Sequence, residues 1–82
     1  MTNQEKYNKV FTTLFNIDDH QLNKDFTFKN VEDWDSILHL SLITELEDTF
    51  DVMLETEDIL SFGSYENGMK ILEKYKVSFN DV

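Results

Sequence analysis

The chain has 82 residues, enough for one small domain spanning residues 1–82, and its 40% hydrophobic content is typical of a globular rather than a disordered protein. Seventeen acids against seven lysines give a formal net charge of −10, which disfavours nucleic-acid binding and favours basic patches on protein partners. No cysteine, signal-peptide pattern or membrane-spanning apolar run is present, so disulfides and thiolate sites are excluded and we expect a cytoplasmic location.

The first predicted element is a helix over residues 2–17. Thr2 and Glu5 have the spacing of a capping box at its start. Its apolar residues follow helical spacing: Tyr7, Val10, Phe11, Leu14, Phe15 and Ile17.

A long first loop is expected over residues 18–34. Phe26 and Phe28 alternate with polar residues, as in a short strand, but no partner strand is evident. We expect four apolar side chains to pin this loop to the core: Leu22, Phe26, Phe28 and Val31.

Residues 36–50 form the clearest helix, with Asp35 as the expected N-cap. Leu42, Leu46 and Phe50 recur every four residues. Further apolar residues broaden the start of this face: Ile37, Leu38, Leu40 and Ile43.

Residues 55–60 predict one or two helical turns, and Ser64 is expected to cap a last helix. The expected apolar face of that helix comprises Tyr65, Met69, Leu72 and Tyr75. Gly68 within it costs about 1 kcal/mol relative to alanine, so the helix should depend on packing. Residues 77–82 are expected to fray. The prediction is an all-α, small four-helix bundle, with three longer helices and a short third one, most simply a monomer.

Several enzyme patterns fail, so we expect neither catalysis nor a metal site. His39 follows Ser36 by one helical turn, but a serine nucleophile also needs an orienting group, an oxyanion hole and a cleft. We expect instead a solvent-facing histidine near a partner surface. His20 beside two aspartates, and the acidic clusters at residues 45–48 and 55–58, are interpreted as solvated groups.

A serine at the junction of Asp35 and the apolar run of residues 37–40 could cap the helix or present a hydroxyl for modification. Asp35, Ser36 and Ile37 stand at a helix start, in a chain whose length, acidity and helix order resemble the acyl carrier protein family. The resemblance extends downstream to Leu42, Leu46, Glu47, Phe50 and Asp51.

The resemblance implies that a phosphopantetheinyl transferase joins 4'-phosphopantetheine from coenzyme A to the Ser36 hydroxyl. Asp35 would fix the helix start and contribute to the transferase's metal site. The arm would carry an acyl group as a thioester to acyl-activating, acyltransferase or synthase enzymes of a fatty-acid, polyketide or other specialised pathway. Two alternatives remain open: a peptidyl or aminoacyl carrier, and an unmodified acidic adaptor in which Asp35 and Ser36 only cap a helix.

The resemblance also implies that the helix after Ser36 is the recognition surface. The expected partner-binding residues are Ile37, Leu38, Glu45, Glu47 and Asp48. Leu38 and Ser41 occupy positions that are often acidic in housekeeping fatty-acid carriers, and Trp34 replaces a small residue. We expect docking to shift from charge pairing toward apolar contact, unless Trp34 and Leu38 merely pack on the first loop.

Overall fold

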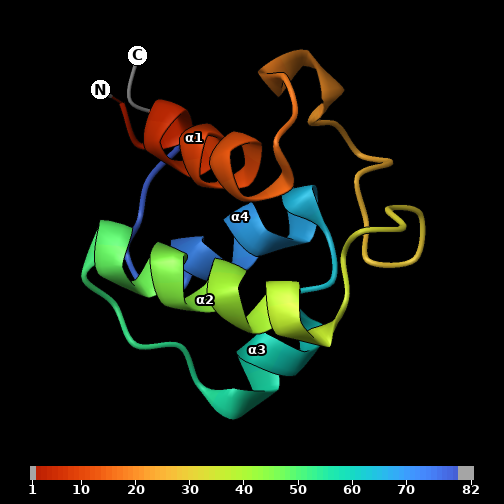
Figure 1. Ribbon diagram of the computed structural model, residues 1–82. Helices are drawn as coiled ribbons and strands as arrows, with labels where there is room; N and C mark the ends of the chain where they lie inside the picture. Colours follow the sequence, from red (N-terminus) through yellow and green to blue (C-terminus); the bar gives the residue numbers. More distant parts are fainter. Residues whose placement is uncertain (1, 80–82) are drawn as a thin grey trace.

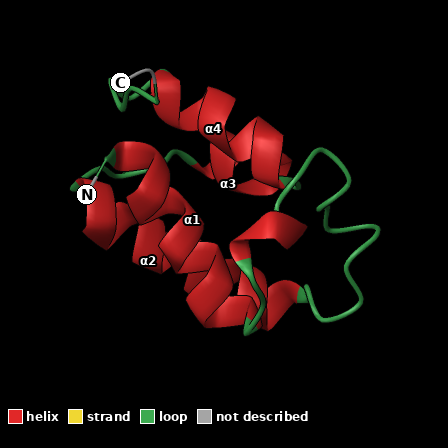
Figure 2. Cartoon of the chain, turned by 90° about the horizontal axis from the view of Figure 1, so that it is seen from above, coloured by secondary structure: helices red, strands yellow, loops and turns green. Residues whose placement is uncertain are grey.

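The structure, a computed structural model, describes residues 2–79, and it is helical as expected (Figure 1). Its elements are α1 (Asn3–Phe15), the short 3-10 helix η1 (Asp19–Gln21), α2 (Ser36–Phe50), α3 (Thr56–Ser61) and α4 (Tyr65–Glu73). Helices α1 and α2 run in roughly opposite directions, and α3 lies beside the N-terminal half of α2 (Figures 1 and 2). The predicted four-helix plan, with a short third helix and a long first loop, is confirmed.

The predicted capping box of α1 is confirmed. The Thr2 hydroxyl accepts a hydrogen bond from the Glu5 amide at 3.1 Å, and the Glu5 carboxylate accepts one from the Thr2 amide at 2.9 Å. The helix ends at Phe15, two residues before the predicted limit, because Asn16 adopts the left-handed conformation (φ 56°) that commonly terminates helices.

Aromatic rings fill the core, and Phe11 lies at their centre without exposed surface. Six rings lie within 6.5 Å of the Phe11 ring, measured between centroids: Tyr7, Phe15, Phe26, Trp34, Phe62 and Tyr65. Such pairs contribute beyond the apolar area that they bury. The cluster packs α1, the first loop and α4 against one another.

A β-bridge between Thr27 and Ser64 adds to the aromatic contacts that hold the first loop. The Phe28 amide donates to the Gly63 carbonyl at 2.8 Å. The alternation of Phe26 and Phe28 thus reflects one extended pairing, whose partner lies just before α4. Phe26 is buried, as predicted, but Phe28 is 44% exposed, so its expected role in the core is wrong.

Helix α4 begins as expected, with the Ser64 hydroxyl accepting a hydrogen bond from the Asn67 amide at 3.0 Å. Tyr65 and Leu72 are buried, and Ile71, which the predicted face omitted, is buried too. Tyr75 lies beyond the end of this helix, where its hydroxyl contacts the α3 region instead. All four residues of the predicted face pack on the core, although Tyr75 does so from beyond the end of the helix.

Gly68 is buried where α4 approaches α1 and Phe62. A Cβ at this position would lie 2.2 Å from the Phe62 ring and 2.3 Å from the Tyr7 hydroxyl oxygen. Only glycine leaves room for these two side chains. The close packing of α4 at Gly68 explains why this helix depends on tertiary contacts, as expected.

The predicted fraying of residues 77–82 is wrong for its first part. Val77 is buried, and the Phe79 ring packs against the rings of Tyr7 and Phe50 at 5.3 and 6.1 Å. The Asn3 side-chain amide also donates to the Ser78 carbonyl at 2.9 Å. Residues 80–82 lie outside the described residues.

Candidate functional site

Ser36 is the first residue of α2, and Asp35 is its N-cap, as predicted. The Asp35 Oδ1 accepts a hydrogen bond from the Leu38 amide at 2.9 Å, and its backbone carbonyl accepts the His39 amide at 2.8 Å. The helix start is therefore fixed by Asp35, whether or not Ser36 contributes. The sequence left open whether Asp35 and Ser36 both cap the helix, and the structure shows that Asp35 is the cap.

The Ser36 side chain is exposed, and its hydroxyl makes no hydrogen bond to any of residues 2–79. The amides of Ser36 and Ile37 lie in the first turn of a 15-residue helix, where amides have no partner within the helix. Such amides and the helix dipole favour a negative charge. A phosphodiester on the Ser36 oxygen would therefore be compatible with this terminus.

An open cavity of about 420 Å³ adjoins Ser36. Helix α2 supplies Ser36, His39 and Leu40, and the other lining residues are Phe28, Ile59, Leu60 and Gly63. Leu40 is 61% exposed and Leu60 is 78% exposed, so apolar surface surrounds the hydroxyl. Sequence patterns did not predict the contribution of Leu60, because a six-residue helix is too short to show a periodic face.

His39 is half-buried between three segments, so the predicted solvent-facing histidine is wrong. The Trp34 indole N–H donates to His39 Nδ1 at 3.0 Å, and His39 Nε2 lies 2.8 Å from the Ile59 carbonyl oxygen. The imidazole plane is inclined by 28° to the Trp34 ring, with centroids 6.0 Å apart. No hydrogen bond joins His39 to Ser36 among the described residues, because both ring nitrogens of His39 are directed at Trp34 and Ile59.

Asp58 fixes the other side of α3. It is buried, and its carboxylate accepts hydrogen bonds from Lys74 Nζ at 2.6 Å and from the Tyr75 hydroxyl. These hydrogen bonds, from Lys74 and then Tyr75, hold the pKa of Asp58 below its ordinary value. The same contact with Asp58 raises the pKa of Lys74. A charged carboxylate is therefore part of what positions α3.

The five predicted partner-binding residues lie in different surroundings. Ile37 is 79% exposed beside Ser36, whereas Leu38 is half-buried and packs against the core. Glu45 and Asp48 are exposed. Glu47 is half-buried, and its carboxylate accepts a hydrogen bond from the Leu54 amide at 2.9 Å, so it also stabilises the chain after α2.

Trp34 is 2% exposed and packs against the aromatic core. The expectation that it contributes an apolar docking surface is wrong, since no partner can reach it without unfolding the loop. The exposed apolar side chains near Ser36 are instead Phe28, Ile37, Leu40 and Leu60.

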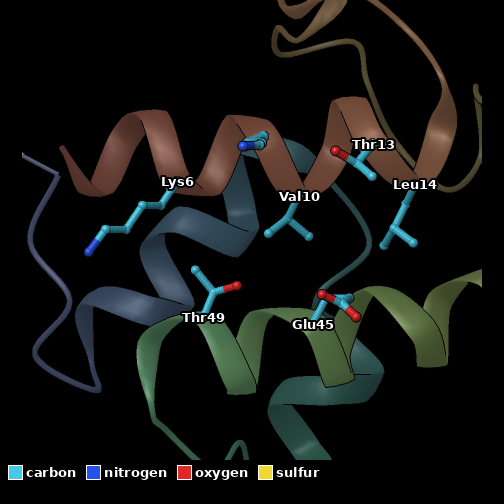
Figure 3. A pocket seen from close by; sticks show the side chains of 7 residues that line it. Lys6, Val10, Thr13, Leu14, Glu45 and Thr49 are labelled. Atoms are coloured by element: carbon cyan, nitrogen blue, oxygen red, sulfur yellow. The ribbon is translucent and has the colours of Figure 1, made fainter. Parts of the chain in front are cut away.

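A second groove, of about 330 Å³, lies between α1 and α2 (Figure 3). Val10 and Leu14 from α1 face Glu45 and Thr49 from α2 in Figure 3. Ser36 does not line it, so the groove is separate from the candidate site. Within residues 2–79, no group of three histidine, cysteine or acidic residues is placed to hold a metal ion, and none of the helices is long and apolar enough to cross a membrane.

Comparison with known proteins agrees with this geometry. The chain is 38% identical over 61 residues to the acyl carrier protein of Lactobacillus johnsonii, an alignment that covers 71% of this chain and 76% of the relative. The chain belongs to the acyl carrier protein family. No family model matches the sequence, and no solved structure matches it significantly.

Acyl carrier proteins hold cargo and present it to enzymes, and they are not themselves catalysts. Membership of the family therefore agrees with the rejection of the enzyme patterns, and it assigns the chain a carrier role with partner enzymes. Family membership does not by itself identify the attachment residue, the cargo or the individual partner enzymes.

Proposed function

We propose that the protein carries acyl groups as thioesters on a 4'-phosphopantetheine arm attached to Ser36, in a cytoplasmic biosynthetic pathway. The observation that carries this proposal is an exposed Ser36 hydroxyl with no hydrogen bond among the described residues, at a helix start that Asp35 already caps. A serine needed for capping would have its oxygen occupied. Ser36 is instead available for covalent attachment.

The surroundings of Ser36 fit the group. The first-turn amides favour the phosphate, and the 420 Å³ cavity offers apolar surface next to the attachment oxygen. When bound, the arm supplies the thiol that this cysteine-free chain lacks. The residues of the chain hold and orient the attachment point, while Asp35 keeps its Oδ2 without a partner among residues 2–79, which suits a contribution to the transferase's magnesium site.

Enzymes that act at Ser36 must cover the side chains around it, and these are apolar. Ile37, Leu40 and Leu60 are each more than 60% exposed, whereas the acids of α2 begin at Glu45, more than two turns away. The proposed partners are the transferase and acyl-activating, acyltransferase or synthase enzymes with apolar surface at the active-site entrance. Glu45 and Asp48 would meet basic residues at the rim.

Intact mass measurement tests the attachment. The protein is incubated with coenzyme A, magnesium and a promiscuous phosphopantetheinyl transferase, and we expect the mass to increase by one phosphopantetheine. Ser36→Ala should abolish the increase, whereas Ser41→Ala, at an exposed serine of the same helix, should not. If folded wild-type protein gains no mass with several transferases, Ser36 is not the attachment site and the protein is an unmodified member of its family.

The apolar docking surface is tested by two equally exposed residues. Leu60 and Met53 are 78% and 83% exposed, but only Leu60 lines the cavity at Ser36. We expect Leu60→Ser to raise the transferase KM about fivefold or more, and Met53→Ser to leave it unchanged. We also expect the wild-type KM to vary little with salt, since a steep rise would show that charge pairing dominates docking.

A further inference from the structure

We propose that His39 is a positioning residue of the Ser36 site, whose neutral imidazole fastens α3, one wall of the cavity, to the segment that precedes Asp35. The inference rests on the proposed function, because it concerns how the surface around the attachment serine keeps its shape. It begins from two hydrogen bonds of one imidazole ring, to Trp34 and to Ile59.

The two partners fix the protonation of the ring. An indole N–H can only donate, so His39 Nδ1 must accept and carries no proton. A carbonyl oxygen can only accept, so Nε2 must carry the proton that is directed at Ile59. His39 is therefore neutral, in the Nε2–H form. Both polar groups that it satisfies would lose their partner if the ring were replaced by a hydrocarbon.

The ring connects three parts of the chain. His39 belongs to α2, one turn after Ser36, while Trp34 ends the first loop and Ile59 belongs to α3. Edge contacts with Phe28 and Phe62, at 6.1 and 6.2 Å between centroids, confine the imidazole further. The side chain lines the Ser36 cavity and at the same time holds the opposite wall.

Helix α3 depends on such contacts, because six residues are too few for a helix to be stable alone. Leu60 points largely into solvent and anchors little. The α4 side of α3 is held by Asp58, through Lys74 and Tyr75. The α2 side is held by the hydrogen bond between His39 and Ile59 together with the packing of Ile59 and Phe62 on the core, so loss of the bond would let the wall nearest Ser36 open more often.

The imidazole can be observed directly, without any modification of Ser36. Nitrogen-15 NMR of the histidine side chains should show His39 with an unprotonated Nδ1 and a protonated Nε2 that exchanges slowly with water. His20, which is exposed in the first loop, is the internal reference within the same spectrum. Fast tautomer averaging at His39 would overturn the assignment.

Three variants separate the hydrogen bonds from the ring shape. His39→Phe keeps an aromatic ring but removes both bonds, whereas His39→Gln keeps one acceptor and one donor in a planar amide. Trp34→Phe removes the bond to Nδ1 and leaves the bond to Ile59, but it also reduces the size of a buried ring. We expect amide hydrogen exchange in α3 to be about tenfold faster in His39→Phe, less affected in Trp34→Phe, and close to wild type in His39→Gln. Exchange in α1 should stay unchanged in the two His39 variants.

Transferase kinetics at Ser36 test whether the position of α3 affects modification of the serine. The His39→Phe variant should raise the transferase KM about three- to tenfold with an unchanged kcat, since the hydroxyl and its cap are untouched, and His39→Gln should restore the KM. Equal KM values and equal α3 exchange in His39→Phe and wild type would overturn the inference. So would an equal defect in His39→Phe and His39→Gln, because the hydrogen bonds would then be irrelevant.

The two proposals fail in different ways. If wild-type protein is not loaded at Ser36, the proposed function fails, and the imidazole resonances and α3 exchange still decide whether His39 fastens the wall. If wild-type protein is loaded but the variants show no change in KM or exchange, only the role of His39 fails. Where His39→Phe is too unstable to assay, the wild-type spectrum decides: a slowly exchanging proton on His39 Nε2 supports the bond to Ile59, and fast tautomer averaging overturns it.

Discussion

Two regions of the molecule are held together by different forces. Around Phe11, aromatic rings from α1, the first loop and α4 pack in a buried cluster. Around α3, polar contacts add to the packing of Ile59 on the core: a histidine against a backbone carbonyl, and a carboxylate between Lys74 and Tyr75. Buried rings tolerate little displacement, whereas a few hydrogen bonds can open and close.

This difference matters because the Ser36 cavity lies between the two regions. The cap and the first turn of α2 belong to the rigid part, since Leu42 and Leu46 are fully buried a short distance along the helix. The opposite wall belongs to α3. Ser36, the proposed attachment point, is thus on the rigid side of the cavity, whereas α3 on the opposite side is held by fewer contacts.

The largest expected effect comes from removing the centre of the aromatic cluster. Phe11→Ala should lower the free energy of unfolding by about 3–5 kcal/mol, because the lost ring leaves a cavity that its neighbours cannot fill. Met53→Ala, at an 83% exposed position, should change it by less than about 0.5 kcal/mol. Urea denaturation measures both, and a small loss in Phe11→Ala would show that the rigid region is not centred there.

An intermediate effect is expected where α4 touches this cluster. Gly68→Ala should reduce stability by about 1–3 kcal/mol, although alanine is the better helix former, because its methyl group would overlap the Phe62 ring and the Tyr7 hydroxyl. Lys70→Ala, at an exposed position of the same helix, serves as the control. A gain in stability in Gly68→Ala would mean that the two side chains can move aside.

The smallest effect is expected in the polar region, and it depends on pH. The pKa of Asp58 is lower in the folded chain than in the unfolded one, so its contribution is present above the ordinary aspartate pKa and is lost as the pH falls through the lowered value. Asp58→Asn should therefore flatten the acid side of the stability curve relative to wild type.

Glu57→Gln is the matched control, because Glu57 belongs to the same helix and its side chain is exposed. It should retain the wild-type slope in acid. Thermal denaturation across the acid range compares the three proteins. Identical acid slopes for wild type and Asp58→Asn would show that Lys74 and Tyr75 do not stabilise the charged carboxylate.

Much of the fold followed from local patterns. Capping residues Thr2, Asp35 and Ser64 were predicted correctly, because a side-chain oxygen next to a periodic apolar run has one dominant use. Periodicity alone did not show which apolar side chains are exposed: Ile37 and Leu40 continue the apolar face of α2 but remain exposed, as the partner-binding prediction for Ile37 requires. Helix α3 covers only one side of that end of α2, and a sequence cannot show which side of an apolar helix lacks a neighbour.

The candidate site divides in the same way. Asp35 and Ser36 could be identified from the sequence, because the pattern consists of three adjacent residues, Asp35 to Ile37, at a predicted helix start. His39 was misassigned because one of its two partners is the backbone carbonyl of Ile59, twenty residues away. A contact with a distant backbone atom cannot be predicted from residue types. The contribution of Leu60 to the cavity was missed for a related reason, as a short helix gives no periodic signal.

The sequence by itself determined the helix order, the caps, the acidity and the serine at the start of α2, because these depend on neighbouring residues and on total composition. Only the tertiary structure decided that Trp34 is core, that Gly68 is a contact point, and that His39 joins the loop to α3. Those outcomes depend on which distant atoms come within hydrogen-bond or van der Waals distance, and that is settled when the helices pack.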